Sequence, residues 1–472
     1  MFAKDRAAHA QNTFDVVNPY SRKKVGTVSM TSTDEINLLL KSANEFRQIP
    51  SGIDRASILK KVEEQLRKHK EDFAMTITSE SGLSLKDTLH EVDRTANVAH
   101  FASLIAEKIE TDTSRNYELI PSQNKIKLKV ITEPLGLVVA ITPFNHPLNQ
   151  VAHKILPAIA AGACIILKPS SKTPLSALKL HRLLLKAGLP KEMCHVVTGM
   201  PADKVVDQLV SFPNVDMVTF TGGLEVGLRI VKKMVNSGNA LKKTVLELGG
   251  CSALIVNDDA DIERATEVAQ AGCFSNSGQR CTAIRRIIVL NKVANTFVGH
   301  FTRTTKKLKC GDPFDRVTDM GTLISEEAAK SVEKRVNGAI KDGAKLILGN
   351  ERRGALYPPT ILDFVHSHSE LVAHETFGPV GAILRVETLD QAIQVANQTN
   401  YRLAGAIITR KKETAEKVSN QLGVGQFSWN GTPSYRTECA PFGGFKNSGN
   451  GEKEGVLQAA YGMRRIRTFY EH

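Results

Sequence analysis

The chain has 472 residues, of which 42% are apolar and 24% are charged. At roughly 100 to 200 residues per domain, this length predicts two to four domains with a sizeable core. The ordinary glycine, proline and aromatic contents exclude a disordered, collagen-like or disulfide-stapled protein. A formal net charge of +13 favours anionic ligands. The basic residues are dispersed and lack the interleaved aromatic side chains on which bases stack, which argues against nucleic-acid binding.

The seven cysteines are an odd number and are scattered along the chain. They form no CxxC pair and no cysteine and histidine set at metal-binding spacing, so we expect no metal site and a reducing compartment. The first ten residues, MFAKDRAAHA, contain no apolar segment of signal-peptide length. The longest apolar run, residues 155–167, is too short to cross a bilayer. These features predict a cytoplasmic protein without an anchor.

The N-terminal region is predicted to open with a strand, a turn and a strand over residues 14–30, with Asn18 and the proline after it at the turn. Ser32 and Glu35 form a capping-box pattern at the start of a helix. A second amphipathic helix is predicted around residues 58–66, where apolar side chains recur at helical spacing.

From residue 136 onward, short apolar strands alternate with helix-length segments. Such alternation predicts βαβ units, mostly parallel sheets and an α/β fold with two domains. The strands read GLVVAI, ACIIL, HVV, DMVTF, TVLEL and SALIV, and then RRIIVL, KLILG, VGAILRV and RLAGAIIT. Before this series, residues 125–131 (KIKLKVI) place lysines at every second position. Such lysines favour an edge strand in a projecting hairpin used for oligomer contacts, or an ordinary surface strand.

Reactive and small residues follow the predicted strands, where open α/β sheets bind ligands. They lie in the segments ITPFNHPLN, LKPSSKTP, FTGGLEVG and ELGG, and in SNSGQRCTAI after a helix. Gly222 and Gly223 are either a phosphate-binding turn at a helix N-terminus or a plain turn, and the GxGxxG spacing is absent.

Three residues in these segments have side chains suited to acyl chemistry. Cys281 follows Arg280, a cation that favours the nucleophilic thiolate, although a lone cysteine is often a small buried apolar residue. Glu247 ends an apolar strand, where it acts either as a general base of raised pKa or as a salt-bridged residue. Asn145 lies between two prolines and either donates to an oxyanion or caps a helix.

Seven motifs in this order resemble the aldehyde dehydrogenase superfamily nearly from end to end: PFNHP, LKPS, FTGG, ELGG, GQRCT, ETFGPV and PFGGFKNSG. The resemblance implies a Rossmann-type cofactor domain over residues 1–113 and 133–248 and an α/β catalytic domain over residues 249–445. It also implies a small bridging element over residues 114–132 and 446–472, and assembly into a homodimer or homotetramer.

By the same resemblance, Cys281 is the nucleophile, Glu247 the general base and Asn145 an oxyanion donor. Lys154 resembles the family's lysine in the proton network near the active site. The implied reaction is an NAD(P)-dependent aldehyde oxidation through a thiohemiacetal and a thioester, which water hydrolyses. Glu247 favours hydrolysis, since relatives that pass the acyl group to coenzyme A typically lack it.

The implied cofactor-binding residues are Lys168, Ser171, Gly222, Gly223, Glu375 and Phe377. Ser171 stands where many NAD-specific relatives have a glutamate for the ribose hydroxyls, which leaves room for a 2′-phosphate. Gly223 stands where many have a serine. We expect NAD as the cofactor, with NADP possible.

The motif details resemble the branch that includes phosphonoacetaldehyde, non-phosphorylating glyceraldehyde-3-phosphate and lactaldehyde dehydrogenases. The candidate substrate-binding residues are Arg94, His146, Arg280 and Arg436, since arginine forks suit tetrahedral oxyanions. Phosphonoacetaldehyde is the substrate that we expect, with the other two aldehydes as alternatives. Arg94 could instead be a solvated or salt-bridged helical residue, Arg436 could be a plain surface loop residue, and His146 could only pack beside the prolines. An alternative of another class is a non-catalytic nucleotide-binding or assembly protein.

Overall fold

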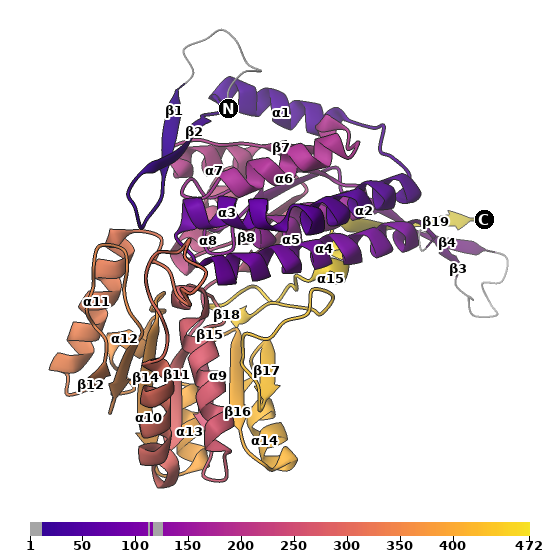
Figure 1. Cartoon of the computed structure of the whole chain (residues 1–472). Helices are drawn as coiled ribbons and strands as arrows, with labels where there is room; N and C mark the ends of the chain where they lie inside the picture. The colour runs from indigo at the N-terminus through magenta and orange to yellow at the C-terminus, as the bar shows by residue number, and fades with distance from the viewer. Residues whose placement is uncertain (1–11, 112–113, 117–125) are drawn as a thin grey trace.

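The computed structural model describes residues 12–111, 114–116 and 126–472 (Figure 1). The chain opens with the predicted antiparallel pair, β1 (Thr13–Val17) and β2 (Lys24–Ser29). The side-chain oxygen of Asn18 accepts hydrogen bonds from the backbone of Tyr20 and Ser21, at 3.1 and 2.8 Å, which closes the turn. The strand-turn-strand prediction is confirmed.

Four helices follow: α1 (Thr33–Glu45), α2 (Gly52–Lys68), α3 (Lys70–Ser81) and α4 (Leu85–Thr111). The predicted capping box is present, because Ser32 and Glu35 exchange side-chain-to-backbone hydrogen bonds. Figure 1 shows α2 and α4 running side by side across the strands that follow, and α4 also packs against α5. These helices cover the first large sheet.

The first large sheet has five parallel strands in the order β7-β6-β5-β8-β9. Its strands are β5 (Leu137–Ile141), β6 (Cys164–Lys168), β7 (Cys194–Val196), β8 (Met217–Thr221) and β9 (Lys243–Glu247). The connecting helices are α5 (Asn149–Ala161), α6 (Leu175–Lys186), α7 (Ala202–Ser211) and α8 (Leu224–Asn236). The strand order reverses between β5 and β8, and doubly wound sheets bind ligands at the carboxyl ends of strands at such a point.

The second large sheet has seven strands in the order β12-β13-β14-β11-β10-β16-β17, and only the β12–β13 pair is antiparallel among the described residues. Its strands are β10 (Ser252–Val256), β11 (Ile284–Leu290), β12 (Lys345–Leu348), β13 (Thr360–Asp363), β14 (Val380–Val386), β16 (Ala404–Ile408) and β17 (Gln426–Trp429). Its helices are α9 (Ile262–Phe274), α10 (Asn291–Thr305), α11 (Glu326–Lys341), α12 (Glu370–Ala373), α13 (Leu389–Ala396) and α14 (Lys412–Leu422). Every residue of β10, β11 and β16 is buried, as expected of strands covered on both faces. The α/β fold class is confirmed.

A small antiparallel sheet projects from the side of the molecule and carries the C-terminus (Figure 1). It contains β3 (Ser114–Asn116), β4 (Lys127–Pro134) and β19 (Arg464–Glu471). Because β4 is the middle strand, the expectation of an edge strand at residues 125–131 is wrong for the part that the structure describes; Lys125 lies outside the described residues. Both edges of β4 are paired, but the sheet stands out from the molecule. The residues of β4 from Lys127 to Pro134 are therefore exposed or half-buried, which accounts for the alternating lysines.

A two-stranded sheet and a short helix complete the described structure. The short strands β15 (Tyr401–Arg402) and β18 (Phe445–Lys446) pair with each other, and α15 (Val456–Gly462) packs against α5 and α4. The domain boundaries given above stay a prediction.

Candidate active site

The predicted nucleophile, Cys281, lies half-buried in the loop between α9 and β11. Asn276 and Ser277, which precede Cys281 in this loop, have φ angles of 58° and 54°. This left-handed conformation costs energy for residues other than glycine. Their side chains hold the conformation in place. Asn276 Nδ2 donates to the Asn145 carbonyl at 2.9 Å, and Ser277 Oγ donates to the Gly321 carbonyl at 3.2 Å.

The buried guanidinium of Arg285, in β11, fixes the other side of the loop. It donates to the carbonyls of Gly278 and Arg280 at 2.7 and 2.9 Å, and to the Gly378 carbonyl at 3.0 Å. Arg285 therefore ties the Cys281 loop to the loop that carries Glu375 and Phe377. Sequence reasoning missed this residue, because an arginine inside an apolar strand gives no sign of the carbonyls it will meet.

A glycine makes room for the nucleophile's backbone. A Cβ atom on Gly250, in the turn between β9 and β10, would lie 2.1 Å from the Cys281 carbonyl oxygen. Since that neighbour is backbone, a larger residue would displace the nucleophile. The motif ELGG therefore ends in a glycine for a steric reason.

Asn145 lies close to the nucleophile, in the loop after β5. Its Nδ2 donates to the Gln279 carbonyl at 2.8 Å, two residues before Cys281. One of its two amide hydrogens is thus used to hold the loop, which leaves the second available for another acceptor.

The Cys281 thiol has a pKa raised to about 12. Burial is the main cause, and the charges of Glu375 and Glu247 raise the pKa further, whereas those of Arg280 and Arg436 lower it. The structure thus brings the predicted nucleophile together with the predicted base, one nicotinamide-binding residue and two of the predicted substrate-binding arginines.

Glu247, the predicted base, is the last residue of β9 and is 2% exposed. Within the described part of the chain, neither of its carboxylate oxygens has a hydrogen-bond partner. Burial, and next the charge of Glu454, raise the pKa of Glu247 well above its usual value, while Lys154 and Arg436 lower it. A carboxyl group of this kind binds a proton readily, as a general base requires.

Lys154, on α5, forms a buried ion pair with Glu454 and donates to Thr219 Oγ1 at 2.8 Å. Burial would raise the pKa of Glu454, but the charge and hydrogen bond of Lys154 outweigh it and lower that pKa. The charges of both residues act on the pKa of Glu247. Glu454 was not predicted as a site residue, because it lies beyond the last motif in the sequence. Only the fold brings it next to Lys154.

Two of the predicted substrate-binding arginines have no carboxylate partner. Arg280 Nη2 donates to the Ser434 carbonyl at 3.1 Å, and the Arg436 guanidinium stacks 4.0 Å from the centre of the Phe442 ring. Among the described residues, neither arginine forms an ion pair, although both act on the pKa of Cys281. Both therefore bring positive charge that no neighbouring carboxylate pairs with.

Arg94, on α4, is held differently. Its Nε and Nη2 atoms form a bidentate ion pair with Glu438, at 2.6 and 3.2 Å. Glu438 also accepts a hydrogen bond from His153 Nε2, at 2.5 Å, and Arg436 Nη2 lies 3.5 Å from His153 Nδ1. Neither Glu438 nor His153 was predicted, although Glu438 lies two residues after Arg436 in the segment PSYRTE.

The predicted residue His146 faces Glu91 of α4, with its Nδ1 3.6 Å from Glu91 Oε2. The other oxygen of Glu91 accepts from the backbone N–H groups of Leu148 and Asn149, at 2.8 and 2.9 Å, and so caps the start of α5. Burial lowers the pKa of His146, so its imidazole is neutral at pH 7. It therefore offers hydrogen bonding rather than charge.

A second group of predicted residues lies at the carboxyl end of β6. The Lys168 ammonium is buried, which lowers its pKa to about 8, and it donates to the Pro169 carbonyl at 3.0 Å and to Ser171 Oγ at 3.4 Å. Ser171 Oγ donates to the Gly199 carbonyl at 3.2 Å. No carboxylate of the described chain pairs with Lys168, so its charge is available to a ligand.

Between β6 and the nucleophile, the N-terminus of α8 is open for a phosphate group. Gly223 caps this helix, and a Cβ atom there would meet nothing within 4 Å, whereas one on Gly222 would lie 2.4 Å from the Phe220 ring. The buried hydroxyls of Thr142 and Thr221, at the ends of β5 and β8, find no hydrogen-bond partner in the described structure. Free helix N–H groups and unpaired hydroxyls at the reversal of strand order fit a dinucleotide.

Glu375 and Phe377, the residues predicted to bind the nicotinamide, lie near the turn that carries Gly250. Glu375 Oε1 accepts from the Gly250 backbone N–H at 2.9 Å, and the Phe377 ring lies edge-on to Phe144 with ring centres 5.9 Å apart. The predicted cofactor residues thus run from β6, past the start of α8, to the neighbourhood of Cys281.

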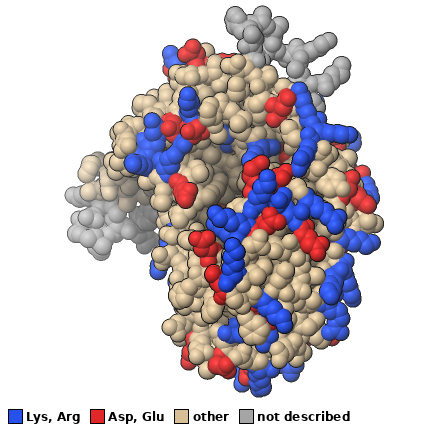
Figure 2. Space-filling model, turned by 90° about the vertical axis from the view of Figure 1, so that its left-hand side faces the viewer, with Lys and Arg blue, Asp and Glu red and all other residues tan. Residues whose placement is uncertain are grey.

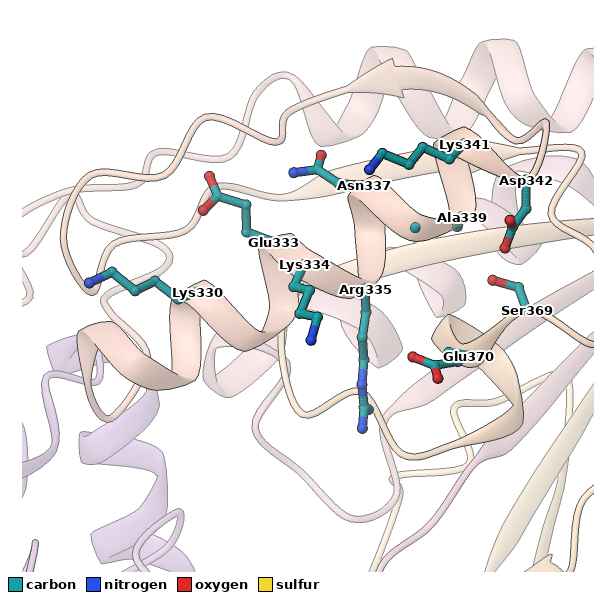
Figure 3. A pocket seen from close by; sticks show the side chains of 11 residues that line it. Lys330, Glu333, Lys334, Arg335, Asn337, Ala339, Lys341, Asp342, Ser369 and Glu370 are labelled. Carbon is teal, nitrogen blue, oxygen red and sulfur yellow. The ribbon is translucent and has the colours of Figure 1, made fainter.

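One hollow lies elsewhere, on α11 and α12, with a volume of about 520 Å³ (Figure 3). No predicted site residue lines it. Arg335 extends from α11 at this hollow and donates to the Glu375 carbonyl and, at 3.2 Å, to Thr376 Oγ1. Figure 2 shows lysines and arginines mixed with acidic residues on the face of the molecule that it presents. Arg335 connects this hollow to the loop that carries Glu375. The residues that line the hollow do not indicate which ligand or reaction it would serve.

The model of the aldehyde dehydrogenase family matches residues 6–468. The chain belongs to this family. It is therefore an NAD(P)-dependent oxidoreductase that acts on aldehydes.

Curated relatives match over almost the whole chain. A 3-sulfolactaldehyde dehydrogenase of Priestia aryabhattai is 36% identical over 96% of this chain and 94% of its own length. A sulfoacetaldehyde dehydrogenase of Neptuniibacter caesariensis is 35% identical over 97% of this chain and 99% of its own length.

Solved structures match equally widely. A glyceraldehyde-3-phosphate dehydrogenase from Methanocaldococcus jannaschii, complexed with NADP, has a TM-score of 0.91 and 34% identity and covers 98% of this chain and 100% of its own. A betaine aldehyde dehydrogenase from Staphylococcus aureus, complexed with NAD+, has a TM-score of 0.91 and 32% identity and covers 97% and 92%. Both cofactors therefore occur among these structural neighbours. In the described chain, no helix is both long and apolar enough to cross a membrane.

Proposed function

We propose that this aldehyde dehydrogenase oxidises a small aldehyde that carries a tetrahedral anion at its other end, and releases the free acid. The observation that carries the proposal is the pair of arginines without carboxylate partners, Arg280 and Arg436, within electrostatic reach of Cys281. A buried cation that lacks a protein counter-charge is costly, and an anionic substrate group would supply that charge. Arg94 and His146 stay candidates for the same group.

The chain's own residues divide the reaction into two steps. The Cys281 thiol gives up its proton to solvent water, and the thiolate sulfur adds to the aldehyde carbon to form a thiohemiacetal, whose oxyanion the free amide hydrogen of Asn145 stabilises. When bound, the cofactor supplies the acceptor for the hydride that leaves this carbon. Glu247 then takes a proton from water, which attacks the resulting thioester and frees the thiol and a carboxylic acid. The Lys154–Glu454 pair borders Glu247 and is suited to pass that proton on.

Two head groups compete as the substrate class. Phosphonoacetaldehyde was the substrate expected from the motifs, and it stays a prediction. Two relatives, a 3-sulfolactaldehyde dehydrogenase and a sulfoacetaldehyde dehydrogenase, favour a sulfonate. Both groups present three oxygens around one centre, which suits arginine forks. Glyceraldehyde 3-phosphate and lactaldehyde stay as alternatives.

The test is a rate comparison on the purified protein. Reduced cofactor is followed by absorbance with phosphonoacetaldehyde, sulfoacetaldehyde, 3-sulfolactaldehyde, glyceraldehyde 3-phosphate, lactaldehyde and a neutral aldehyde of similar size, each with NAD and with NADP. The proposal expects one anionic aldehyde to exceed the neutral one in kcat/KM, and Arg280→Ala to abolish most of that advantage. An advantage that survives Arg280→Ala would remove the anion pocket. No turnover of any aldehyde would favour the non-catalytic alternative.

Two further inferences concern assembly and location. We infer that the protein forms a homodimer or homotetramer, because β19 leaves the apolar side chains of Ile466, Phe469 and Tyr470 exposed on the projecting sheet. We also infer a cytoplasmic location, which the seven cysteines support, since none of them forms a disulfide.

A further inference from the structure

Four side chains near Cys281 form a continuous chain of polar contacts, Arg94–Glu438–His153–Arg436, in which the two inner residues are buried and the two arginines half-buried. Glu438 is 4% exposed and His153 1% exposed, so solvent does not compete for their hydrogen bonds. Glu438 accepts from Arg94 Nε at 2.6 Å and Nη2 at 3.2 Å, and from His153 Nε2 at 2.5 Å. One carboxylate therefore has contacts with two separate elements, α4 and α5.

The protonation of His153 follows from these contacts. Its Nε2 faces a carboxylate and so carries the hydrogen, while its Nδ1 lies 3.5 Å from Arg436 Nη2 and so accepts. Such a ring is neutral, which agrees with a pKa that burial and the charge of Arg436 lower to about 4. A neutral imidazole orients Arg436 without neutralising it, and the Phe442 ring supports the guanidinium from one side at 4.0 Å.

The two arginines consequently differ in the charge they present. The bidentate pair with Glu438 offsets the charge of Arg94, whereas Arg436 forms no ion pair among the described residues, although the charges of Glu438, Glu454 and Glu247 act on it from a distance. Arg436 therefore keeps both its charge and unused N–H donors for a ligand.

We propose that Glu438 is a positioning residue, which fixes Arg94 directly and Arg436 through His153 and so sets the geometry that selects an anionic aldehyde. This inference rests on the proposed function and deepens it. Glu438 and His153 need not touch the substrate.

Glu438→Gln tests the inference by the direction of its effect. If the carboxylate only diluted the positive charge of the pocket, its neutralisation would strengthen anion binding and lower the KM for the anionic aldehyde. If it positions the arginines, the KM rises by about tenfold to a hundredfold, as expected when a charge-assisted hydrogen bond is lost. The KM for the neutral aldehyde, which has no anion for the arginines to bind, changes much less than the KM for the anionic aldehyde. A lowered or unchanged KM for the anionic aldehyde would overturn the inference.

Substitutions at His153 give an independent second measurement if Glu438→Gln does not fold. A glutamine can donate through its amide nitrogen and accept through its oxygen, so His153→Gln retains most of the anionic preference, whereas His153→Leu loses it. His181→Gln is the matched control, since His181 lies in α6 and its Nε2 lies 2.8 Å from the Cys194 carbonyl oxygen, a contact that involves neither arginine. Equal anionic preference in His153→Leu and wild type would overturn the inference but leave the proposed function intact. A wild type with no anionic preference would overturn both.

Discussion

Cys281 is a thiol rather than a thiolate in the cofactor-free protein, because burial and the charges of Glu375 and Glu247 outweigh the nearby arginines. The sequence suggested the opposite balance from Arg280 alone, since it does not show how deeply the loop lies or which carboxylates face it. A nucleophile held as a thiol is protected from oxidation and alkylation until it is needed.

This state predicts a pH dependence for alkylation. With a pKa of about 12, the thiolate fraction of Cys281 rises roughly tenfold for each pH unit from 7 to 9. The rate at which iodoacetamide inactivates the cofactor-free enzyme should therefore rise about tenfold for each pH unit, with no plateau in the rate between pH 7 and 9. Cys281→Ala, followed by mass spectrometry of the labelled peptide, controls for the other thiols. A plateau between pH 7 and 8 would contradict the prediction.

Glu247 is predicted to act after hydride transfer. Glu247→Gln preserves the shape of the site but cannot take a proton from water, so the first turnover should yield one equivalent of reduced cofactor rapidly. Steady-state acid release should then fall by about a hundredfold or more. Stopped-flow absorbance measures the burst, and intact-protein mass spectrometry detects the acyl group on Cys281. Loss of the burst itself would instead assign Glu247 to the first step.

At the level of elements, the site depends on two loops that approach each other at backbone distance. The turn after β9 passes so close to the Cys281 loop that only a glycine fits at position 250. The role of ELGG was predicted from its position after a strand, but the neighbour that requires the glycine is distant in the sequence and appears only in the fold.

A pair of glycine substitutions tests this contact. Gly250→Ala should lower kcat by about a hundredfold or more, because its methyl group would displace the carbonyl of Cys281 and with it the attack geometry. Gly299→Ala is the control, since no atom lies within 4 Å of a Cβ atom at this position in α10. It should leave activity unchanged and raise the free energy of unfolding by about 0.5 to 1 kcal/mol. Steady-state kinetics measure the effect on kcat, and urea unfolding measures the effect on stability. A fully active Gly250→Ala would show that the turn can shift away from Cys281 without loss of the attack geometry.

The strands and the motif segments were predictable because buried parallel strands read as continuous apolar runs, and because ligands bind where such strands end. The partners of the motif residues were not. Glu438 and Glu454 are ordinary glutamates in the sequence, and only burial beside Arg94 and Lys154 gives them a function. The middle position of β4 was also missed, because alternating lysines indicate exposure and do not indicate which strands pair.

At the scale of the whole molecule, we propose the projecting sheet as the site of assembly. Removal of residues 464–472 deletes β19 and leaves β4 with an unpaired edge. We expect this truncation to convert the oligomer to a monomer or to aggregates, as measured by size-exclusion chromatography with light scattering. Ile466→Lys with Phe469→Lys is the milder variant, which keeps the strand and removes only exposed apolar area. An unchanged mass for both variants would exclude this sheet from the interface.

The clamp formed by Arg285 has a consequence for motion. One guanidinium holds carbonyls of the nucleophile loop and of the Glu375–Phe377 loop through three hydrogen bonds. Two of these bonds hold the nucleophile loop, and only the bond to the Gly378 carbonyl reaches the other loop; a hydrogen bond to a charged group contributes about 1.5 to 3 kcal/mol, which opposes separation of the loops by that amount. The loops therefore move as one body. Any rearrangement that admits water to the acyl group after hydride transfer must come from displacement of the bound nicotinamide or from segments outside this clamp.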